Sequence, residues 1–562
     1  MRAARSPCAT TLQGSGPARR LWRLAVAWPL VSIVLLTLAQ HGLTVGAKDL
    51  WFSDEVRHGG VLRDLLVHGD WLALKLNDTL YPDKPPVYFW YLAGLATLFG
   101  ATAPWVIYVG LAGTVFMLYV ATHRMALRLT GDPATALLSV LVLASGFYFA
   151  TMTHYARMDH MFAAAIAASW TAFFTGMRAE LRRGAILAGF GFMALAAMIK
   201  GPVGIMFPAL SLVGFALWRR RPGWLLDRSV VGGLGIVAGV TALWAGGIVA
   251  IAGPDYFAHL FETQIVDRGL NKDSGSLGMF RYAVTLPLIF LPWTLLLLVV
   301  PWRREGAVSP EVAFLWITAG LGFVALSLVA EKHEYYLVPV LVPLAILAAR
   351  GYAGLDAVRA RLFWSLALGL TGLLGTILAV ASRVERSFDP DVGDYGPAIP
   401  LLELPGLLLL AGAVLLWPFR GAARPLVATG FVLLQAVFVT ATAIRVFPAV
   451  DAVLSPSLVT DEMRPYTRVG HAPGILHGRD GVFAYHLGMH YTDFPVEEEV
   501  WPWLDATPRA VLALPAELWW PVAGRHPEAG AAACVRFAGR PILVVAKPPP
   551  EGLATPADCA RP

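Results

Sequence analysis

The stretch that decides the fold class runs from Trp22 to Leu43 and reads WRLAVAWPLVSIVLLTLAQHGL. A helix needs about 20 mostly apolar residues to cross the hydrocarbon core of a bilayer, and this stretch has that length. Similar apolar runs fill most of the chain, since 57% of the 562 residues are hydrophobic and only 15% are charged. Soluble domains carry about 25% charged residues. The composition therefore predicts an α-helical polytopic membrane protein whose first span is 22–43.

The positions of the basic residues predict how the chain crosses the membrane. Arg19 and Arg20 precede the first span, so the positive-inside rule places the N-terminus in the cytoplasm. Later basic clusters, such as the three arginines at 219–221, fall on the same side only if the apolar run 86–100 does not cross. We therefore expect about 13 transmembrane helices, with 86–100 lying along the outer face of the membrane.

The same membrane topology divides the chain into two domains. Residues 1–446 are expected to form the transmembrane domain, with outward juxtamembrane loops at 44–103 and 253–280. Residues 447–562 are more polar and contain turn residues and short strand-like runs such as Ala510–Leu514. They predict a small α/β domain outside the membrane. In a bacterium this means a multi-pass protein of the inner membrane with a periplasmic C-terminal domain.

Two classes of binding are not expected from the sequence. The formal net charge is +6, but the basic residues lie in short clusters between apolar runs, which is typical of topology signals. We therefore expect no nucleic-acid partner. His486 and His490 are four residues apart and could share a helix face and bind a metal. Their neighbours Phe483 and Tyr491 favour a strand and its turn instead, so we expect no metal on this pair.

The three cysteines predict one disulfide. Cys534 and Cys559 fall in the domain expected to be periplasmic, whereas Cys8 falls in the cytoplasm. An oxidising compartment permits disulfides, and the spacings match no zinc or redox motif. We therefore expect a bond between Cys534 and Cys559.

The outward loops differ from the cytoplasmic ones because they carry both signs of charge beside apolar stretches. Such groups are Asp54-Glu55-x-Arg57, Asp83-Lys84, Arg157-x-Asp159, Lys200, Glu262 with Arg268, and Glu331-Lys332 to Tyr336. Arginine grips phosphate in a planar, bidentate way and lysine supplies a mobile point charge. A carboxylate whose pKa is raised by burial can accept a proton from a hydroxyl. The pattern predicts a reaction with an anionic leaving group.

Each group also has a purely structural interpretation. Asp54 and Glu55 could simply begin an interfacial helix from Ser53 to Val67, with Ser53 as its N-cap. Lys84 could be a snorkelling lysine at a rigid helix entry, and Tyr336 could belong to an aromatic belt. A functional interpretation is favoured because all these groups are expected on one face of the membrane.

Taken in order, these motifs resemble a known family. They are Asp54-Glu55-x-Arg57, Gly69-Asp70-Trp71, DKPPVYFW at 83–90, ARMD at 156–159, Lys200-Gly201-Pro202, Pro292-Trp293, and KHEYYLVP at 332–339. The chain resembles bacterial aminoarabinose lipid A transferases and the wider group of polyprenyl-phosphate-dependent, protein mannosyltransferase-like enzymes with the GT-C fold. The resemblance covers most of residues 20–350.

The resemblance implies an integral-membrane inverting glycosyltransferase with its catalytic domain at 1–446. Its donor would be a sugar linked to undecaprenyl phosphate or a similar polyprenyl phosphate. The implied catalytic carboxylate is Asp54, supported by Asp159, Asp83 and Glu55. The residues implied to grip the donor phosphate are Arg57, Lys84, Arg268 and Tyr336, with Arg157, Lys200 and Lys332 in support. No metal or other cofactor is required, because these cations can stabilise the leaving phosphate.

Two departures from the family pattern leave the sugar and the acceptor open. Asp83 stands where relatives often have glutamate, and His58 stands where tyrosine is frequent. We expect an envelope acceptor with a lipid or protein hydroxyl or phosphate, such as lipid A or a related glycolipid, reached at the periplasmic face. A protein O-glycosyltransferase of the same family is the alternative. A transporter or flippase would instead place its charges near the bilayer midplane.

Overall fold

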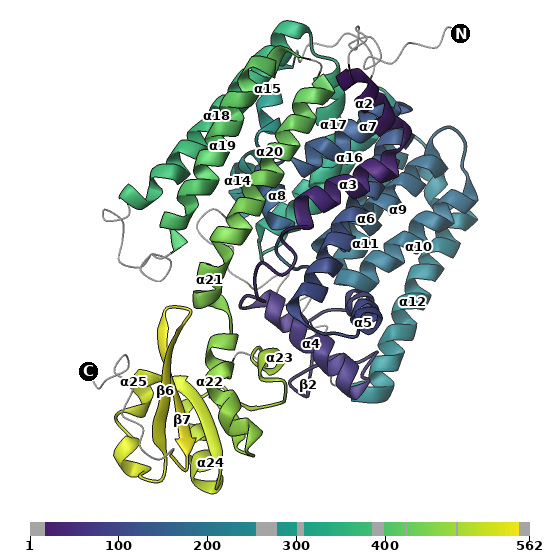
Figure 1. Cartoon of the computed structure of the whole chain (residues 1–562). Coiled ribbons are helices and arrows are strands. Elements are labelled where there is room, and N and C mark those ends of the chain that lie inside the picture. The colour runs from purple at the N-terminus through teal and green to yellow at the C-terminus, as the bar shows by residue number, and fades with distance from the viewer. Residues whose placement is uncertain are drawn as a thin grey trace.

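A bundle of helices makes up most of the computed structural model, and a small sheet domain lies beyond one end of it (Figure 1). The structure describes residues 17–81, 83–254, 278–300, 308–384, 398–422, 424–478 and 481–549. The element α4 (Asp54–His68) runs obliquely across the end of the bundle that faces the sheet domain (Figure 1). This helix is therefore in a position to join the two parts.

The N-terminal segment does not form the single straight span that the sequence predicts. The run 22–43 is divided into α2 (Pro17–Ala27) and α3 (Pro29–His41), and the two axes differ by 106°. The physical reason is Pro29, which has no N–H to donate and would clash with the preceding turn of a continuous helix. The segment from α3 to the bundle then contains α4, β1 (Lys75–Leu76), β2 (Thr79–Leu80) and α5 (Val87–Phe99).

The bundle proper follows α5. Its α-helices are α6 (Pro104–Thr130), α7 (Pro133–Ala144), α8 (Phe147–Met152), α9 (Asp159–Met177), α10 (Arg183–Lys200), α11 (Val203–Trp218), α12 (Arg228–Ala252), α14 (Arg281–Ile289), α15 (Leu296–Val299), α16 (Pro310–Leu328), α17 (Val338–Ala353), α18 (Ala357–Val384), α19 (Glu403–Leu416) and α20 (Arg424–Arg445). Short 3₁₀ turns link some of them, including η5 (Glu334–Leu337) before α17. The bundle core contains Trp293 of the Pro292-Trp293 motif, which is 1% exposed and donates to Ser145 Oγ at 3.0 Å.

The helix lengths support a multi-pass membrane protein. Within the described ranges, 8 helices are long and apolar enough to cross a bilayer, or up to 10 if each of two bent pairs is one span. The expected number of about 13 stays a prediction, because runs predicted to cross, such as α7 and α11, form helices shorter than 18 residues. The helix α5 has only 13 residues, but α7, which is predicted to cross, is shorter still. The placement of 86–100 along the membrane therefore stays a prediction.

The C-terminal domain is a mixed sheet with short helices. Its elements are α21 (Phe447–Leu454), α22 (Ser457–Arg468), β3 (Ala472–Leu476), α23 (Ala484–Leu487), β4 (Thr492–Phe494), α24 (Val500–Ala506), β5 (Ala510–Pro515), α25 (Ala516–Trp519), β6 (Gly530–Phe537) and β7 (Arg540–Lys547). The strand order is β4-β3-β5-β7-β6, with β3 parallel to β4 and β5, and β7 antiparallel to β5 and β6. Residues of β5 and β7 such as Leu512 and Val544 are completely buried. The strand predicted at 510–514 is thus present at the centre of the sheet.

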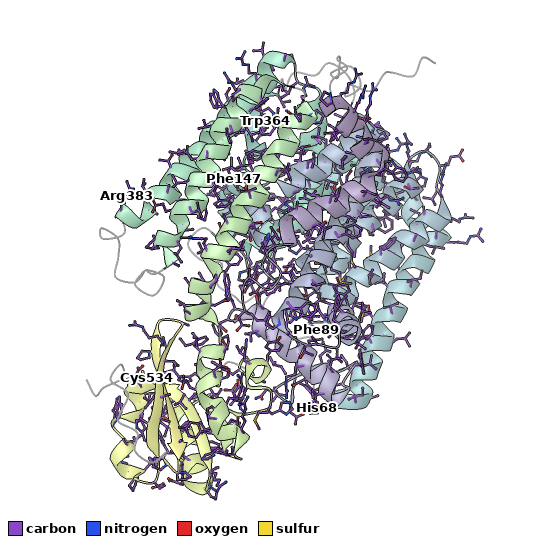
Figure 2. The ribbon with its side chains drawn as sticks, in the orientation of Figure 1. His68, Phe89, Phe147, Trp364, Arg383 and Cys534 are labelled. Carbon is purple, nitrogen blue, oxygen red and sulfur yellow. The ribbon has the colours of Figure 1, made fainter. Side chains whose placement is uncertain are left out.

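Cys534 lies on β6 of this domain (Figure 2) and is disulfide-bonded. Its predicted partner, Cys559, falls outside the described residues, as does Cys8. The identity of the partner therefore stays a prediction.

Hydrogen bonds connect the C-terminal domain to the segment that contains α4. Asn77 exchanges two hydrogen bonds of 2.9 Å with the backbone of Tyr491. His486 Nε2 lies 2.9 Å from both carboxylate oxygens of Asp49. Burial would raise the pKa of Asp49, but the contact with His486 outweighs it and holds this pKa at about 2. These polar contacts fix how the domain sits on the end of the bundle.

Candidate active site

The helix α4 carries the first candidate residues at its N-terminal end. It begins at Asp54 as predicted, with Ser53 at the N-cap position, but the Ser53 side chain makes no capping hydrogen bond. Asp54 and Arg57 are three residues apart on one face, with Arg57 Nη1 3.9 Å from the carboxylate. The side chain of Asp54 is 28% exposed, so the pair faces an accessible space.

Arg157 links Asp54 to Asp159. Its Nη1 forms an ion pair with Asp54, and its Nε donates to Asp159 Oδ2 at 3.0 Å. The guanidinium carbon lies 3.5 Å from the ring centroid of Tyr335, so the aromatic face covers the cation. A planar guanidinium with several fixed donors suits this arrangement, in which two carboxylates are held at different edges of one group.

Lys200 completes the same cluster from the end of α10. Its Nζ forms an ion pair with Asp159, which is 1% exposed, and lies 4.5 Å from the ring centroid of Tyr336. Gly201 directly follows with φ of +77°, a left-handed conformation that glycine adopts without strain and that ends the helix there. The predicted Lys200-Gly201-Pro202 motif therefore positions the lysine at the mouth of the bundle.

Asp83 and Lys84 lie beside the cluster on the loop that leads into α5. Asp83 is 3.6 Å from Arg57 Nη1, so this arginine lies between two carboxylates. Lys84 Nζ donates to the backbone oxygen of Asp83 at 2.9 Å. The structure thus brings eight of the predicted residues to one region: Asp54, Arg57, Asp83, Lys84, Arg157, Asp159, Lys200 and Tyr336.

Glu55 faces away from this cluster, although it is the immediate neighbour of Asp54. It is 0% exposed, and its Oε2 lies 2.7 Å from Lys48 Nζ, itself 3% exposed. The other oxygen accepts a hydrogen bond from the backbone N–H of Ala156 at 2.6 Å. Glu55 therefore holds the segment that presents Arg157, and its carboxylate is not available to a substrate. Lys48 could not be predicted as its partner, because no motif includes that lysine.

One further predicted residue, Lys332, does not contact the cluster through any hydrogen bond or ion pair that involves its ammonium in the described residues. Lys332 donates to the backbone oxygen of Val329, and Arg281, absent from the prediction, pairs with Glu334 at 2.6 Å. Arg268 lies outside the described residues, as does most of the predicted loop 253–280.

The charges of the cluster control its protonation. Burial would raise the pKa of Asp54, but the adjacent Arg157 guanidinium outweighs burial and holds this pKa below its usual value. Asp54 is therefore not a carboxylate whose pKa is raised by burial. Behind it on the same helix, burial lowers the pKa of His58 to about 4, so this imidazole is neutral at pH 7. His58 Nδ1 lies 3.3 Å from the carbonyl oxygen of Ala156.

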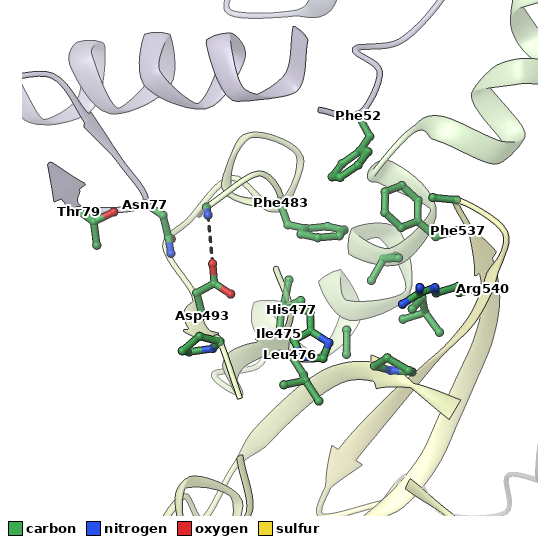
Figure 3. A pocket seen from close by; sticks show the side chains of 17 residues that line it. Phe52, Asn77, Thr79, Ile475, Leu476, His477, Phe483, Asp493, Phe537 and Arg540 are labelled. Atoms are coloured by element: carbon green, nitrogen blue, oxygen red, sulfur yellow. Dashed lines mark hydrogen bonds between the residues drawn. The ribbon is translucent and has the colours of Figure 1, made fainter. Parts of the chain in front are cut away.

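A cavity of about 720 Å³ lies apart from the cluster, between the C-terminal sheet and the β1–β2 hairpin. Figure 3 shows Phe52, Phe483 and Phe537 along one side of it, and Asp493 hydrogen-bonded to the nearby backbone. Of these residues only Phe52 is close in sequence to the cluster, two positions before Asp54. The chemistry suggested by the charged residues therefore lies on α4 and the bundle and not in this cavity.

Comparison with known proteins gives consistent results. A family model described as dolichyl-phosphate-mannose-protein mannosyltransferase matches residues 83–244, which include Asp83, Arg157, Asp159 and Lys200. The undecaprenyl phosphate-alpha-4-amino-4-deoxy-L-arabinose arabinosyl transferase of Pseudomonas paraeruginosa is 30% identical over 437 residues, covering 73% of this chain and 74% of the relative. The transferase of the same name from Erwinia tasmaniensis is 29% identical over 394 residues, covering 67% of this chain and 68% of the relative.

A solved structure has the same fold. The crystal structure of ArnT from Cupriavidus metallidurans bound to undecaprenyl phosphate superposes with a TM-score of 0.76 at 20% identity, covering 93% of this chain and 98% of that one. The predicted resemblance and the predicted helical GT-C fold are confirmed. The chain belongs to the family of undecaprenyl phosphate-alpha-4-amino-4-deoxy-L-arabinose arabinosyl transferases, which are membrane glycosyltransferases.

Proposed function

We propose that the enzyme transfers a sugar from undecaprenyl phosphate to lipid A or a related envelope glycolipid at the periplasmic face of the inner membrane. The observation that carries this proposal is the cluster in which Arg57, Arg157 and Lys200 surround Asp54 and Asp159 at the end of the bundle. A polyprenyl phosphate is anchored in the bilayer and presents its phosphate at headgroup level. Cations fixed at that level can bind it without a nucleotide-sugar domain.

The reaction then follows from the charges. An acceptor oxygen attacks the anomeric carbon of the sugar, the bond from that carbon to the donor phosphate oxygen breaks, and its electrons remain on undecaprenyl phosphate. Arg57 and Lys84 are placed to stabilise the charge that develops on this phosphate. Asp54, ionised at neutral pH, can stabilise the positive charge that glycosyl transfer develops at the anomeric centre. The reaction requires no metal, because the side chains supply the necessary charges.

The protonation of Asp54 favours one kind of acceptor. A hydroxyl acceptor needs a base near pH 7, and a carboxylate with a lowered pKa is a weak one. A phosphate monoester on a glycolipid is already deprotonated and needs no base. This consideration favours a phosphate-bearing glycolipid over a serine or threonine of a protein, and it ranks the protein O-glycosyltransferase second.

The orientation is part of the same proposal. The N-terminus is placed in the cytoplasm, and the domain 447–562 and the cluster are placed in the periplasm. The disulfide at Cys534 supports this orientation, since disulfides persist in the oxidising periplasm and are rare in the cytoplasm.

The test uses the purified full-length protein in lipid nanodiscs with a labelled 4-amino-4-deoxy-L-arabinosyl undecaprenyl phosphate donor. Three acceptors are compared: lipid A, enzymatically dephosphorylated lipid A, and a serine-rich peptide. We expect labelled lipid A and free undecaprenyl phosphate only with the phosphorylated acceptor. Equal transfer to dephosphorylated lipid A would reject the phosphate acceptor, and transfer to the peptide would establish the second candidate. In sealed vesicles, donor movement across the bilayer without release of undecaprenyl phosphate would indicate a flippase.

A further inference from the structure

Three potential metal ligands meet where the C-terminal end of α4 contacts the C-terminal domain. Asp64 and His68 are four residues apart and therefore share one face of the helix. His490, from the loop between α23 and β4, lies against them, and the ligand atoms of all three residues are within 4.8 Å of one another. Figure 2 shows His68 at the end of α4, on the side that faces the C-terminal domain.

The distances suit a zinc ion. Bonds of about 2.0–2.1 Å to Zn²⁺ at a tetrahedral angle place neighbouring ligand atoms about 3.3 Å apart. His490 Nε2 is 3.1 Å from Asp64 Oδ1, and the ring centroids of His68 and His490 are 4.8 Å apart. His68 is exposed at the end of its helix, so its side chain can adjust by the remaining distance. Imidazole and carboxylate are ligands that zinc commonly takes together.

Hydrogen bonds from neighbouring groups orient the carboxylate of Asp64. Asp64 is 0% exposed and accepts hydrogen bonds from Arg63 Nη1 at 3.0 Å and from the backbone N–H of Asp78 at 3.2 Å. Such outer hydrogen bonds hold ligating carboxylates in place. The C-terminal end of a helix also attracts cations. Arg63 itself is fixed by the backbone oxygen of Gly488.

We propose that Asp64, His68 and His490 bind one Zn²⁺, with water as the fourth ligand, and that this ion fastens the C-terminal domain to α4. The site is separate from the proposed catalytic cluster. Asp64 is ten residues beyond Asp54, which at 1.5 Å per residue is about 15 Å along the helix. His486, four residues before His490, is not a ligand, because its Nε2 bonds Asp49.

A second group in the described part of the chain serves as a control. Asp505, His526 and Glu528 also lie close together. That group contains only one histidine, and the Lys547 ammonium lies 3.5 Å from Glu528. Because it lacks a second imidazole, this group is the poorer zinc site.

The experiment measures zinc on the full-length protein, purified in detergent with an affinity tag that contains no histidine. We expect about one Zn²⁺ per chain by elemental analysis, and a dissociation constant for added Zn²⁺ at least about 10-fold weaker in His68→Ala and His490→Ala. The matched control His526→Ala should bind zinc as the wild type does. Because His68 is exposed, its substitution tests the site even if His490→Ala does not fold. A wild type without stoichiometric zinc, or unchanged binding in His68→Ala, would overturn the proposal.

Replacement of zinc by Co²⁺ allows a second, spectroscopic measurement. Tetrahedral cobalt with nitrogen and oxygen ligands absorbs visible light, and we expect this band in the wild type and in His526→Ala but not in His68→Ala. A band that disappears in His526→Ala and persists in His68→Ala would assign the metal to the other group and refute the proposal.

Discussion

Adjacent acids at the start of α4 should respond in opposite ways when each is neutralised. Asp54→Asn removes a charge that is 28% exposed and paired with Arg157. Glu55→Gln removes a charge that is 0% exposed and lies 2.7 Å from the buried Lys48 ammonium. The two substitutions are chemically equivalent and one residue apart, so each controls for the other.

The magnitudes follow from burial. Removing one member of a buried ion pair leaves the other charge without compensation and typically costs about 3–5 kcal/mol. We expect that loss in the free energy of unfolding for Glu55→Gln, because Lys48 is 3% exposed. For Asp54→Asn the partly exposed pair is worth about 1 kcal/mol or less. The rate of sugar transfer by Asp54→Asn should nevertheless fall about 10²–10³-fold if Asp54 stabilises charge in the transition state.

Thermal unfolding followed by tryptophan fluorescence in micelles measures stability, and release of labelled undecaprenyl phosphate measures turnover. The double variant Lys48→Met/Glu55→Gln removes both buried charges and should recover part of the lost stability. The reasoning fails if Glu55→Gln is as stable as the wild type but inactive, since Glu55 would then act in the reaction. It also fails if Asp54→Asn, normally folded, turns over at the wild-type rate.

Three other perturbations have defined outcomes. Lys84→Ala should raise the KM for the donor at least about 10-fold and leave the KM for the acceptor unchanged, since it removes one cation from the proposed phosphate site. An equal loss for both substrates would indicate a structural defect. Burial lowers the pKa of His58 to about 4. The contribution of this group to the free energy of unfolding is therefore fully present above about pH 6.5, the pKa of histidine in the unfolded chain, and is lost as the pH falls to about 4. His58→Gln should therefore flatten the dependence of unfolding free energy on pH in that window by roughly 3 kcal/mol, and a profile as steep as that of the wild type would contradict this assignment. Cysteines introduced near Ala101 and near Gly524 should react with an impermeant thiol reagent from the periplasm, and cytoplasmic labelling at either position would overturn the proposed topology.

Local patterns allowed much of the fold to be predicted. The N-terminal end of α4, the short apolar helix at 87–99 and the strand at 510–515 each follow from a few neighbouring residues. The number of spans does not, because it depends on where helices break, as between α2 and α3. A break shortens a helix without changing the hydropathy of the run.

The candidate site could be predicted as a set of residues but not as a set of pairs. Asp54, Arg157 and Lys200 come from three distant segments, and their predicted location on one face of the membrane was sufficient to group them. That Glu55 would turn toward Lys48 depends on how α4 is rotated against the segment before Arg157, a tertiary property with no local signal. The proposed zinc site could not be predicted from the sequence for the same reason, since His490 is far in sequence from Asp64 and His68.

The placement of β7 has a consequence for biosynthesis. This strand, Arg540–Lys547, follows all the others in sequence yet lies between β5 and β6. While the chain is being synthesised, β6 therefore has no neighbouring strand, and β5 has one unpaired edge, until residue 547 has been made. Chains that stop before Arg540 would expose that edge and the apolar faces that Leu543 and Val545 normally cover. A protease that cleaves exposed, unpaired strands can thereby distinguish incomplete chains from finished ones.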